Sequence, residues 1–186
     1  MKTALILVDI QNDYFPGGRM ELAGMDAAGE TAGALLSYFR ENKWPTVHIQ
    51  HISTQKGASF FLPQTEGVKI HECISPLDQE TVIQKHFPNS FRETDLYDHL
   101  TGTGVKNLVI CGAMSHMCID ATTRAAADLG FSGIVVHDAC ATRDLEFGGN
   151  TITAKDVHAS FMAALGMAYA KVLGYNDFES YAESLK

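Results

Sequence analysis

Apolar and polar positions along the chain follow two alternating patterns. Strand-like apolar runs lie at residues 3–10, 45–52, 80–86, 106–113 and 132–140. The first is continuously apolar as far as Asp9, as expected for a strand covered on both faces of a sheet. Helical spacing of apolar residues is found at 25–43, 94–104, 117–130 and 153–174. This alternation predicts a mostly parallel sheet with helices on both faces.

The ends of these segments carry further signals. Thr153 is a suitable N-cap for the last helical segment, and Gly174 is typical of a helix stop. The polar stretch 53–79 is longer than a usual connection, which makes it a candidate functional loop. Within it, "SFFLP" (residues 59–63) is apolar enough to indicate a pocket wall or a subunit contact.

Composition narrows the possible classes of protein. The net charge of −8 disfavours nucleic acid and anionic membranes as partners, because both require a basic surface. No apolar run approaches the roughly 20 residues that cross a bilayer, and Asp9 interrupts the apolar start that a signal peptide would need. The four cysteines form no CxxC pair, so we expect free thiols in a reducing cytoplasm. A chain of 186 residues is most simply one domain.

Three reactive residues coincide with the ends of predicted strands. Asp9 ends the first strand, Lys85 ends the third, and Cys118 lies in the turn after the fourth. The carboxyl ends of parallel strands share one edge of the sheet, and ligands bind at that edge. We therefore expect the three side chains to meet there.

Together these residues could perform acyl transfer. A helix N-terminus and the Lys85 ammonium would lower the pKa of the Cys118 thiol, and Asp9 would take and return the proton. Backbone N–H groups around Met114 and Cys118 would bind the oxyanion of a tetrahedral intermediate. These parts suffice for hydrolysis through a thioester.

Other interpretations stay open at this point. Cys118 by itself could be a small buried core residue, and His116 could pair with it as a Cys–His dyad. A redox-active thiol resolved by Cys111 or Cys140 is a second class of function. A binder of small molecules without catalysis is a third.

Five segments of the chain carry recognisable motifs: "ALILVDIQNDYF" around Asp9, "VIQKHFPNSF" around Lys85, "VICGAMSHMCIDATTRAAADLGF" around Cys118, and the later "VVHDACAT" and "HASFMAAL". These motifs resemble those of the isochorismatase-like cysteine hydrolases, a superfamily that includes nicotinamidases. The resemblance runs along nearly the whole chain and implies one hydrolase domain over residues 1–186. It implies an Asp–Lys–Cys triad and a cis peptide bond before Met114 that turns its N–H toward the oxyanion.

The resemblance completes the predictions for fold, activity and assembly. We expect a three-layer α/β sandwich whose central sheet has five to six strands in the order 3-2-1-4-5-6. The predicted activity is that of a C–N hydrolase, an amidase, acting on a small molecule. This superfamily tends to form dimers or tetramers, so we expect a homo-oligomer.

Two departures from the family's patterns refine the expected site. Nicotinamidase-type members carry an Asp-x-His metal site, but here His51 and Ser53 occupy those positions, so we predict neither a metal nor a cofactor. Members that act on isochorismate lack the nucleophilic cysteine, so Cys118 disfavours that substrate. The candidate substrate-binding residues are Phe15, His51, Phe91 and His116.

Overall fold

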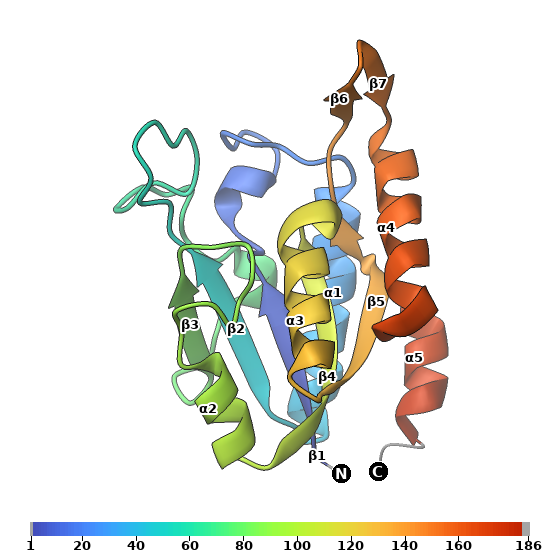
Figure 1. Ribbon diagram of the computed structural model, residues 1–186. Coiled ribbons are helices and arrows are strands. Elements are labelled where there is room, and N and C mark those ends of the chain that lie inside the picture. The colour runs from blue at the N-terminus through green and yellow to red at the C-terminus, as the bar shows by residue number, and fades with distance from the viewer. Residues whose placement is uncertain (1, 184–186) are drawn as a thin grey trace.

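The computed structural model describes residues 2–183 and forms the α/β architecture in Figure 1. The strands are β1 (Lys2–Val8), β2 (Thr46–His51), β3 (Thr81–Lys85), β4 (Val105–Ala113), β5 (Ser132–Ala141), β6 (Leu145–Phe147), β7 (Asn150–Ile152) and β8 (Ala170–Leu173). The α-helices are α1 (Met25–Glu41), α2 (Leu96–Gly102), α3 (Asp120–Asp128), α4 (Ala154–Ala168) and α5 (Tyr175–Ala182). Short helical turns are η1 (Asn12–Tyr14), η2 (Glu72–Ile74) and the π-helical η3 (Ser115–Ile119).

The central sheet confirms the predicted strand order. Within residues 2–183 it has six strands in the order β3-β2-β1-β4-β5-β8, and every neighbouring pair is parallel. Because β1 lies in the middle, its carboxyl end is flanked by those of β2 and β4. The strand order reverses between β1 and β4, and α/β sheets bind ligands at such a topological switch point.

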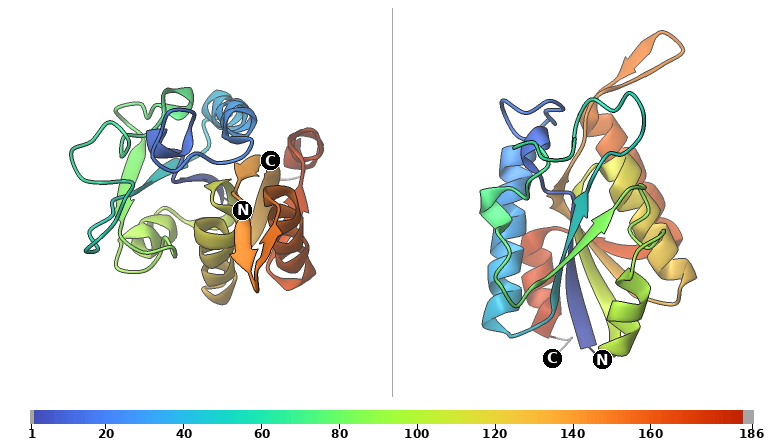
Figure 2. Two further views of the ribbon diagram at one scale, coloured as in Figure 1. Left: turned by 90° about the horizontal axis from the view of Figure 1, so that it is seen from above. Right: turned by 90° about the vertical axis from the view of Figure 1, so that its left-hand side faces the viewer.

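Helices cover both faces of this sheet. Figure 2 shows α1 and α5 on one face and α2, α3 and α4 on the other. Aromatic packing joins α1 and α5, since the rings of Phe39 and Phe178 stack with centroids 6.1 Å apart. Among the described residues, no helix combines the length and the apolar character that a membrane span requires.

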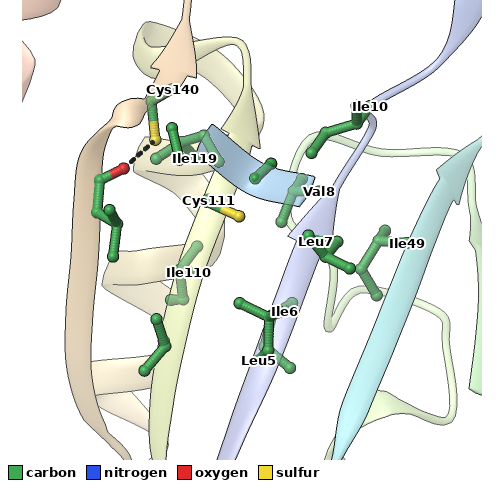
Figure 3. Close-up of a cluster of buried hydrophobic side chains, with 14 of the residues drawn as sticks. Leu5, Ile6, Leu7, Val8, Ile10, Ile49, Ile110, Cys111, Ile119 and Cys140 are labelled. Atoms are coloured by element: carbon green, nitrogen blue, oxygen red, sulfur yellow. Dashed lines mark hydrogen bonds between the residues drawn. The ribbon is translucent and has the colours of Figure 1, made fainter. Parts of the chain in front are cut away.

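The middle strands are buried throughout, as their apolar runs predict. Leu5, Ile6 and Leu7 of β1 have no exposed surface, and they belong to the buried core along the central strands (Figure 3). Cys111 and Cys140 belong to the same core, as expected from their apolar surroundings. Burying each such side chain stabilises the fold by roughly 1.5–3 kcal/mol, so the central strands are a rigid base for the loops that follow them.

The C-terminal part of the chain differs from the sequence prediction. The helix predicted over 153–174 ends at Ala168, and the strand β8 follows it at the edge of the sheet. The Thr153 cap is confirmed, since its side chain accepts a hydrogen bond from the Asp156 N–H. Gly174 does not stop this helix but is the N-cap of α5. The edge of β5 needs a partner strand, and this tertiary constraint outweighs the helical spacing of the local sequence.

A second difference is the hairpin of β6 and β7, for which the pattern of apolar residues predicts no strands. These strands pair with each other and project beyond the carboxyl edge of the sheet (Figure 1). The ring of Phe147 in β6 is 80% exposed. Such short strands give a weak periodic signal, so the pattern of residues did not distinguish them from a loop.

The predicted long connection between β2 and β3 is held to the end of β1 by Asp13. Its carboxylate accepts hydrogen bonds from the N–H of Phe61 at 2.6 Å and from that of Arg19 at 3.2 Å. Its own N–H donates to the Gly67 carbonyl at 2.9 Å. A buried carboxylate that accepts backbone donors fixes a loop without regular structure, and here it brings the loop over the edge where β1 ends.

Gly112 allows β4 to approach β1 just before the functional turn. Its φ is +124°, a conformation that side-chain-bearing residues rarely adopt, and a Cβ there would overlap the carbonyl oxygen of Val8. The register between β4 and β5 also shifts between Ile110 and Gly112. A glycine at this position is therefore required by both conformation and space.

We predict that Gly112→Ala lowers the free energy of unfolding by at least about 2 kcal/mol, because it adds both backbone strain and a steric overlap. Urea unfolding followed by circular dichroism measures this change. Gly102→Ala is the matched control, since a Cβ at Gly102 meets open space, and it should be neutral or slightly stabilising. Equal stability of the two variants would contradict the packing described here.

Candidate active site

Asp9 follows β1 directly and places a fully buried carboxylate at the centre of the sheet edge. Its N–H donates to the carbonyl of Ile49 at 3.0 Å, and its φ is +54°, in the left-handed region. Neither carboxylate oxygen receives a well-aligned hydrogen bond among the described residues. A buried acceptor with free lone pairs can take a proton from a group brought next to it.

Lys85 supplies the positive charge opposite this carboxylate. It ends β3, has no exposed surface, and its Nζ lies 2.8 Å from Asp9 Oδ2. The same ammonium donates to Cys118 Sγ at 3.2 Å and to the Phe87 carbonyl at 3.0 Å. Burial alone would lower the Lys85 pKa, but attraction to Asp9 and Cys118 outweighs it, and the net pKa is raised. The side chain therefore stays charged.

Cys118 lies within η3, the π-helical turn that precedes α3. The residue is 5% exposed. Burial, followed by the negative charge of Asp9, raises the pKa of its thiol, while Lys85 opposes this rise. The expected lowering of the thiol pKa is therefore wrong: the sulfur sits inside the turn, where desolvation exceeds the effects of a helix end and a cation. The resting thiol is protonated and lies beside a carboxylate.

Met114 begins the same turn, and its carbonyl holds the turn closed. That oxygen accepts hydrogen bonds from the N–H of Met117 at 3.0 Å and of Ile119 at 3.2 Å. The Ala113–Met114 peptide bond is cis, as the family resemblance implied. Among residues 2–183, no acceptor is found for the Met114 N–H itself. This donor is thus free for a ligand.

His51 also belongs to this cluster. Its Nδ1 is 3.1 Å from Lys85 Nζ and 4.0 Å from Asp9 Oδ2. Burial lowers its pKa to about 4, so the imidazole is neutral at neutral pH. An ammonium can only donate, so Nδ1 must accept and the imidazole proton lies on Nε2.

Asp9, His51 and Cys118 are also the group whose ligand atoms could hold a metal ion, since these atoms lie within 4.8 Å of one another. The same three side chains contact the Lys85 ammonium, however, at distances of 2.8, 3.1 and 3.2 Å. A divalent cation at that point would be repelled by the lysine charge and would compete for its partners. The residues therefore fit a lysine-centred site better than a metal site.

The other candidate residues have different neighbours. The ring of Phe15 stacks on His71 with centroids 3.5 Å apart, and Phe91 stacks on Phe131 at 5.9 Å. His116 Nδ1 is 2.6 Å from Thr142 Oγ1, which disfavours a Cys–His dyad. Of the four proposed substrate-binding residues, the structure places His51 against the triad. For Phe15, Phe91 and His116 the substrate-binding role stays a prediction.

Tyr14 is a site residue that the sequence analysis missed. It is 2% exposed, and burial, Cys118 and Asp9 all raise the pKa of its phenol, which places it near both groups. Its ring packs against Phe61, with centroids 4.6 Å apart, and Phe60, at 5.8 Å. The sequence feature that points to Tyr14 is the "NDYF" motif, in which only the adjacent Phe15 is predicted to bind substrate. The apolar "SFFLP" stretch thus packs within the chain at this point, and Phe61 is only 1% exposed.

Comparison with known proteins agrees with this geometry. Residues 3–161 match the model of the isochorismatase domain. An isochorismatase family protein of Bacillus subtilis, YddQ, is 54% identical over 172 residues, covering 92% of this chain and 96% of that protein. A crystal structure from Oleispira antarctica, assigned to the isochorismatase hydrolases, superposes with a TM-score of 0.91 at 50% identity and covers 95% of both chains. The ureidoacrylate amidohydrolase RutB of Acinetobacter baylyi is 28% identical over 173 residues, covering 75% of this chain and 70% of that protein.

We predict that Lys85→Met slows alkylation of Cys118 by iodoacetamide at pH 8 by at least about tenfold. Removing the ammonium removes the charge that opposes the raised pKa of the thiol, and each unit of pKa lowers the thiolate fraction tenfold. Mass spectrometry of the peptide that contains Cys118 gives the rate.

Lys69→Met is the control for that experiment, because the Lys69 side chain is 60% exposed and pairs with Glu66 rather than with the triad. It should leave the alkylation rate unchanged. Wild-type alkylation in a folded Lys85→Met protein would show that the ammonium does not act on the sulfur.

Proposed function

This chain belongs to the isochorismatase family of hydrolases, and from that premise we propose that it cleaves a small amide through a thioester on Cys118. The observation that carries the proposal is the buried ammonium of Lys85, which contacts both Asp9 and Cys118. It joins a base and a nucleophile from distant parts of the sequence. The name of the RutB relative, an amidohydrolase, supports C–N cleavage as the reaction class.

In the first half of the reaction, the Cys118 thiol gives its proton to Asp9 while Sγ forms a bond to the amide carbonyl carbon. The carbonyl oxygen becomes an oxyanion and is bound by the N–H groups of Met114 and Cys118. When the oxyanion collapses, the C–N bond breaks and the leaving nitrogen takes the proton from Asp9. An amine or ammonia leaves, and the acyl group stays on the sulfur.

In the second half, water attacks the thioester carbonyl and Asp9 accepts a proton from it. The C–S bond then breaks, the carboxylic acid leaves, and the proton returns to the sulfur. Lys85 stays protonated throughout and stabilises whichever of Asp9 or Cys118 carries the negative charge. The sum of both halves is one amide and one water converted to one acid and one amine.

The alternative of a redox-active thiol is less well supported than hydrolysis, because Cys111 and Cys140, which would have to form a disulfide with oxidised Cys118, are unreactive. Burial raises the pKa of Cys111, and it raises that of Cys140 to about 12. The Cys140 thiol also donates to the Val136 carbonyl at 3.4 Å (Figure 3). Inert, buried thiols are poor partners for disulfide exchange.

Three further features stay predictions alongside this function. They are a single catalytic domain over residues 1–186, a homo-oligomeric state of two or four chains, and a cytoplasmic location. The side chains of Phe147 and Met167 are 80% and 87% exposed, respectively, and give apolar surface that a homo-oligomer could cover.

We predict that Cys118→Ala and Asp9→Asn each lower kcat for the amide substrate by at least about 1,000-fold, because each removes an essential partner of bond formation. A panel of primary amides, followed by ammonia release, identifies the substrate with the wild-type protein. Circular dichroism checks that both variants stay folded.

The control for the nucleophile is Cys73→Ser, which changes a half-buried thiol in the loop that bears η2. It should keep wild-type turnover. Ordinary amide turnover in folded Cys118→Ala protein would refute the thioester mechanism, and tight ligand binding without any turnover would favour a binding protein instead.

A further inference from the structure

We propose that His158 of α4, acting through Ser115, is a positioning residue for the turn that binds the oxyanion. The inference rests on the proposed function, because the oxyanion is that of the proposed amide hydrolysis. In the described part of the chain, the side-chain hydrogen bonds of these two residues go to each other and to Ala141, not to the Cys118 sulfur or the Asp9 carboxylate. Their part is to hold the N–H groups of Met114 and Cys118 in place.

The Ser115 side chain joins three elements. It is fully buried, and its Oγ lies 3.2 Å from the carbonyl of Ala141 at the end of β5 and 2.9 Å from His158 Nδ1. The serine hydroxyl has one proton, and the Ala141 carbonyl can only accept it. When Oγ donates to Ala141, His158 must donate its Nδ1–H to Oγ. The Ser115 hydroxyl, the Ala141 carbonyl and His158 Nδ1 then each have a hydrogen-bond partner.

These hydrogen bonds join the turn to neighbouring elements, which the backbone hydrogen bonds inside the turn do not do. The carbonyl of Met114 closes the turn internally through the N–H groups of Met117 and Ile119. Those bonds set the shape of the turn but not its position relative to β5 and α4. Ser115, which lies between Met114 and Cys118 in sequence, supplies a constraint of that kind to β5 and α4, beside the contact of His116 with Thr142 just after β5. Preorganised donors stabilise an oxyanion only when they are held within a fraction of an ångström.

His158 lines a different cavity from the one in which the triad side chains meet. It borders a cavity of about 380 Å³ whose other lining residues include Ala23, His137 and Lys155 but not Asp9, Lys85 or Cys118. The hydrogen bond to Ser115 is the contact by which its imidazole acts on the turn. Burial lowers its pKa, as does nearby His137, so the neutral form that donates from one nitrogen is favoured.

The test compares two reactions of Cys118. Amide hydrolysis forms an oxyanion and needs its donors, whereas alkylation by iodoacetamide displaces iodide at a saturated carbon and forms none. A change that disturbs only the position of the turn should therefore lower kcat for the amide and leave alkylation and KM unchanged. A general loss of structure would alter all three.

We predict that His158→Leu and Ser115→Ala each lower kcat about 10- to 100-fold, with KM and the alkylation rate within about twofold of wild type. His158→Asn should recover most of the lost kcat, since its amide nitrogen can donate from about the position of Nδ1. The double variant Ser115→Ala, His158→Leu should be no worse than the poorer single variant, because both break one chain of hydrogen bonds.

His137→Leu is the matched control: it removes a neighbouring imidazole, 6.2 Å away between ring centroids, without touching Ser115, and should keep wild-type kcat. If His158→Leu does not fold, Ser115→Ala and His158→Asn provide the same comparison. Wild-type kcat in folded Ser115→Ala, or equal losses of kcat and alkylation, would overturn the inference while Cys118-dependent hydrolysis stands. A wild-type protein without amide turnover would refute the proposed function and this inference with it.

Discussion

A lysine ammonium with no exposed surface lies at the end of β3, and it is stabilised there by a carboxylate and a sulfur, together with an imidazole nitrogen and a backbone carbonyl. Removing an ion from water costs several kcal/mol, and the ion pair of Lys85 with Asp9 at 2.8 Å offsets much of that cost. Neither charge could be buried without the other. The pair therefore requires the ends of β1 and β3 to lie at the same edge of the sheet, within reach of the lysine side chain. It also sets the charges that surround the Cys118 sulfur.

The strand order makes this placement possible. β2 lies between β1 and β3, so the Lys85 side chain must reach across its carboxyl end to meet Asp9. His51 is the residue of β2 that pairs with Lys85 in register, and its Nδ1 accepts from the crossing ammonium. A carboxylate there would add a second negative charge and would turn the cluster toward cation binding. A neutral imidazole instead leaves the pairing of Lys85 with Asp9 undisturbed.

The sequence predicts those parts of the molecule that are set by local pattern. The apolar runs located the first five strands of the sheet, and the positions of Asp9, Lys85 and Cys118 beside strand ends predicted their convergence, which the distances confirm. Features that depend on distant partners were not predicted. β8 forms because β5 has a free edge, and Tyr14 was missed because its neighbours Phe60 and Phe61 come from another segment. The predicted direction of the Cys118 pKa shift was wrong because the position of a residue beside a strand end does not reveal how deeply its side chain is buried.

That reversed pKa changes how the nucleophile is understood. A cysteine with a lowered pKa is a thiolate at rest and reacts with oxidants as readily as with substrates. Here burial and Asp9 keep the thiol protonated, and the carboxylate that raises the thiol pKa is also the group that can accept its proton. In the proposed mechanism, a carbonyl carbon held beside Sγ lets the negative charge pass to an oxyanion bound by the Met114 and Cys118 N–H groups. Reactivity under that proposal depends on those donors more than on the sulfur alone, and so on the hydrogen bonds of Ser115 with β5 and α4.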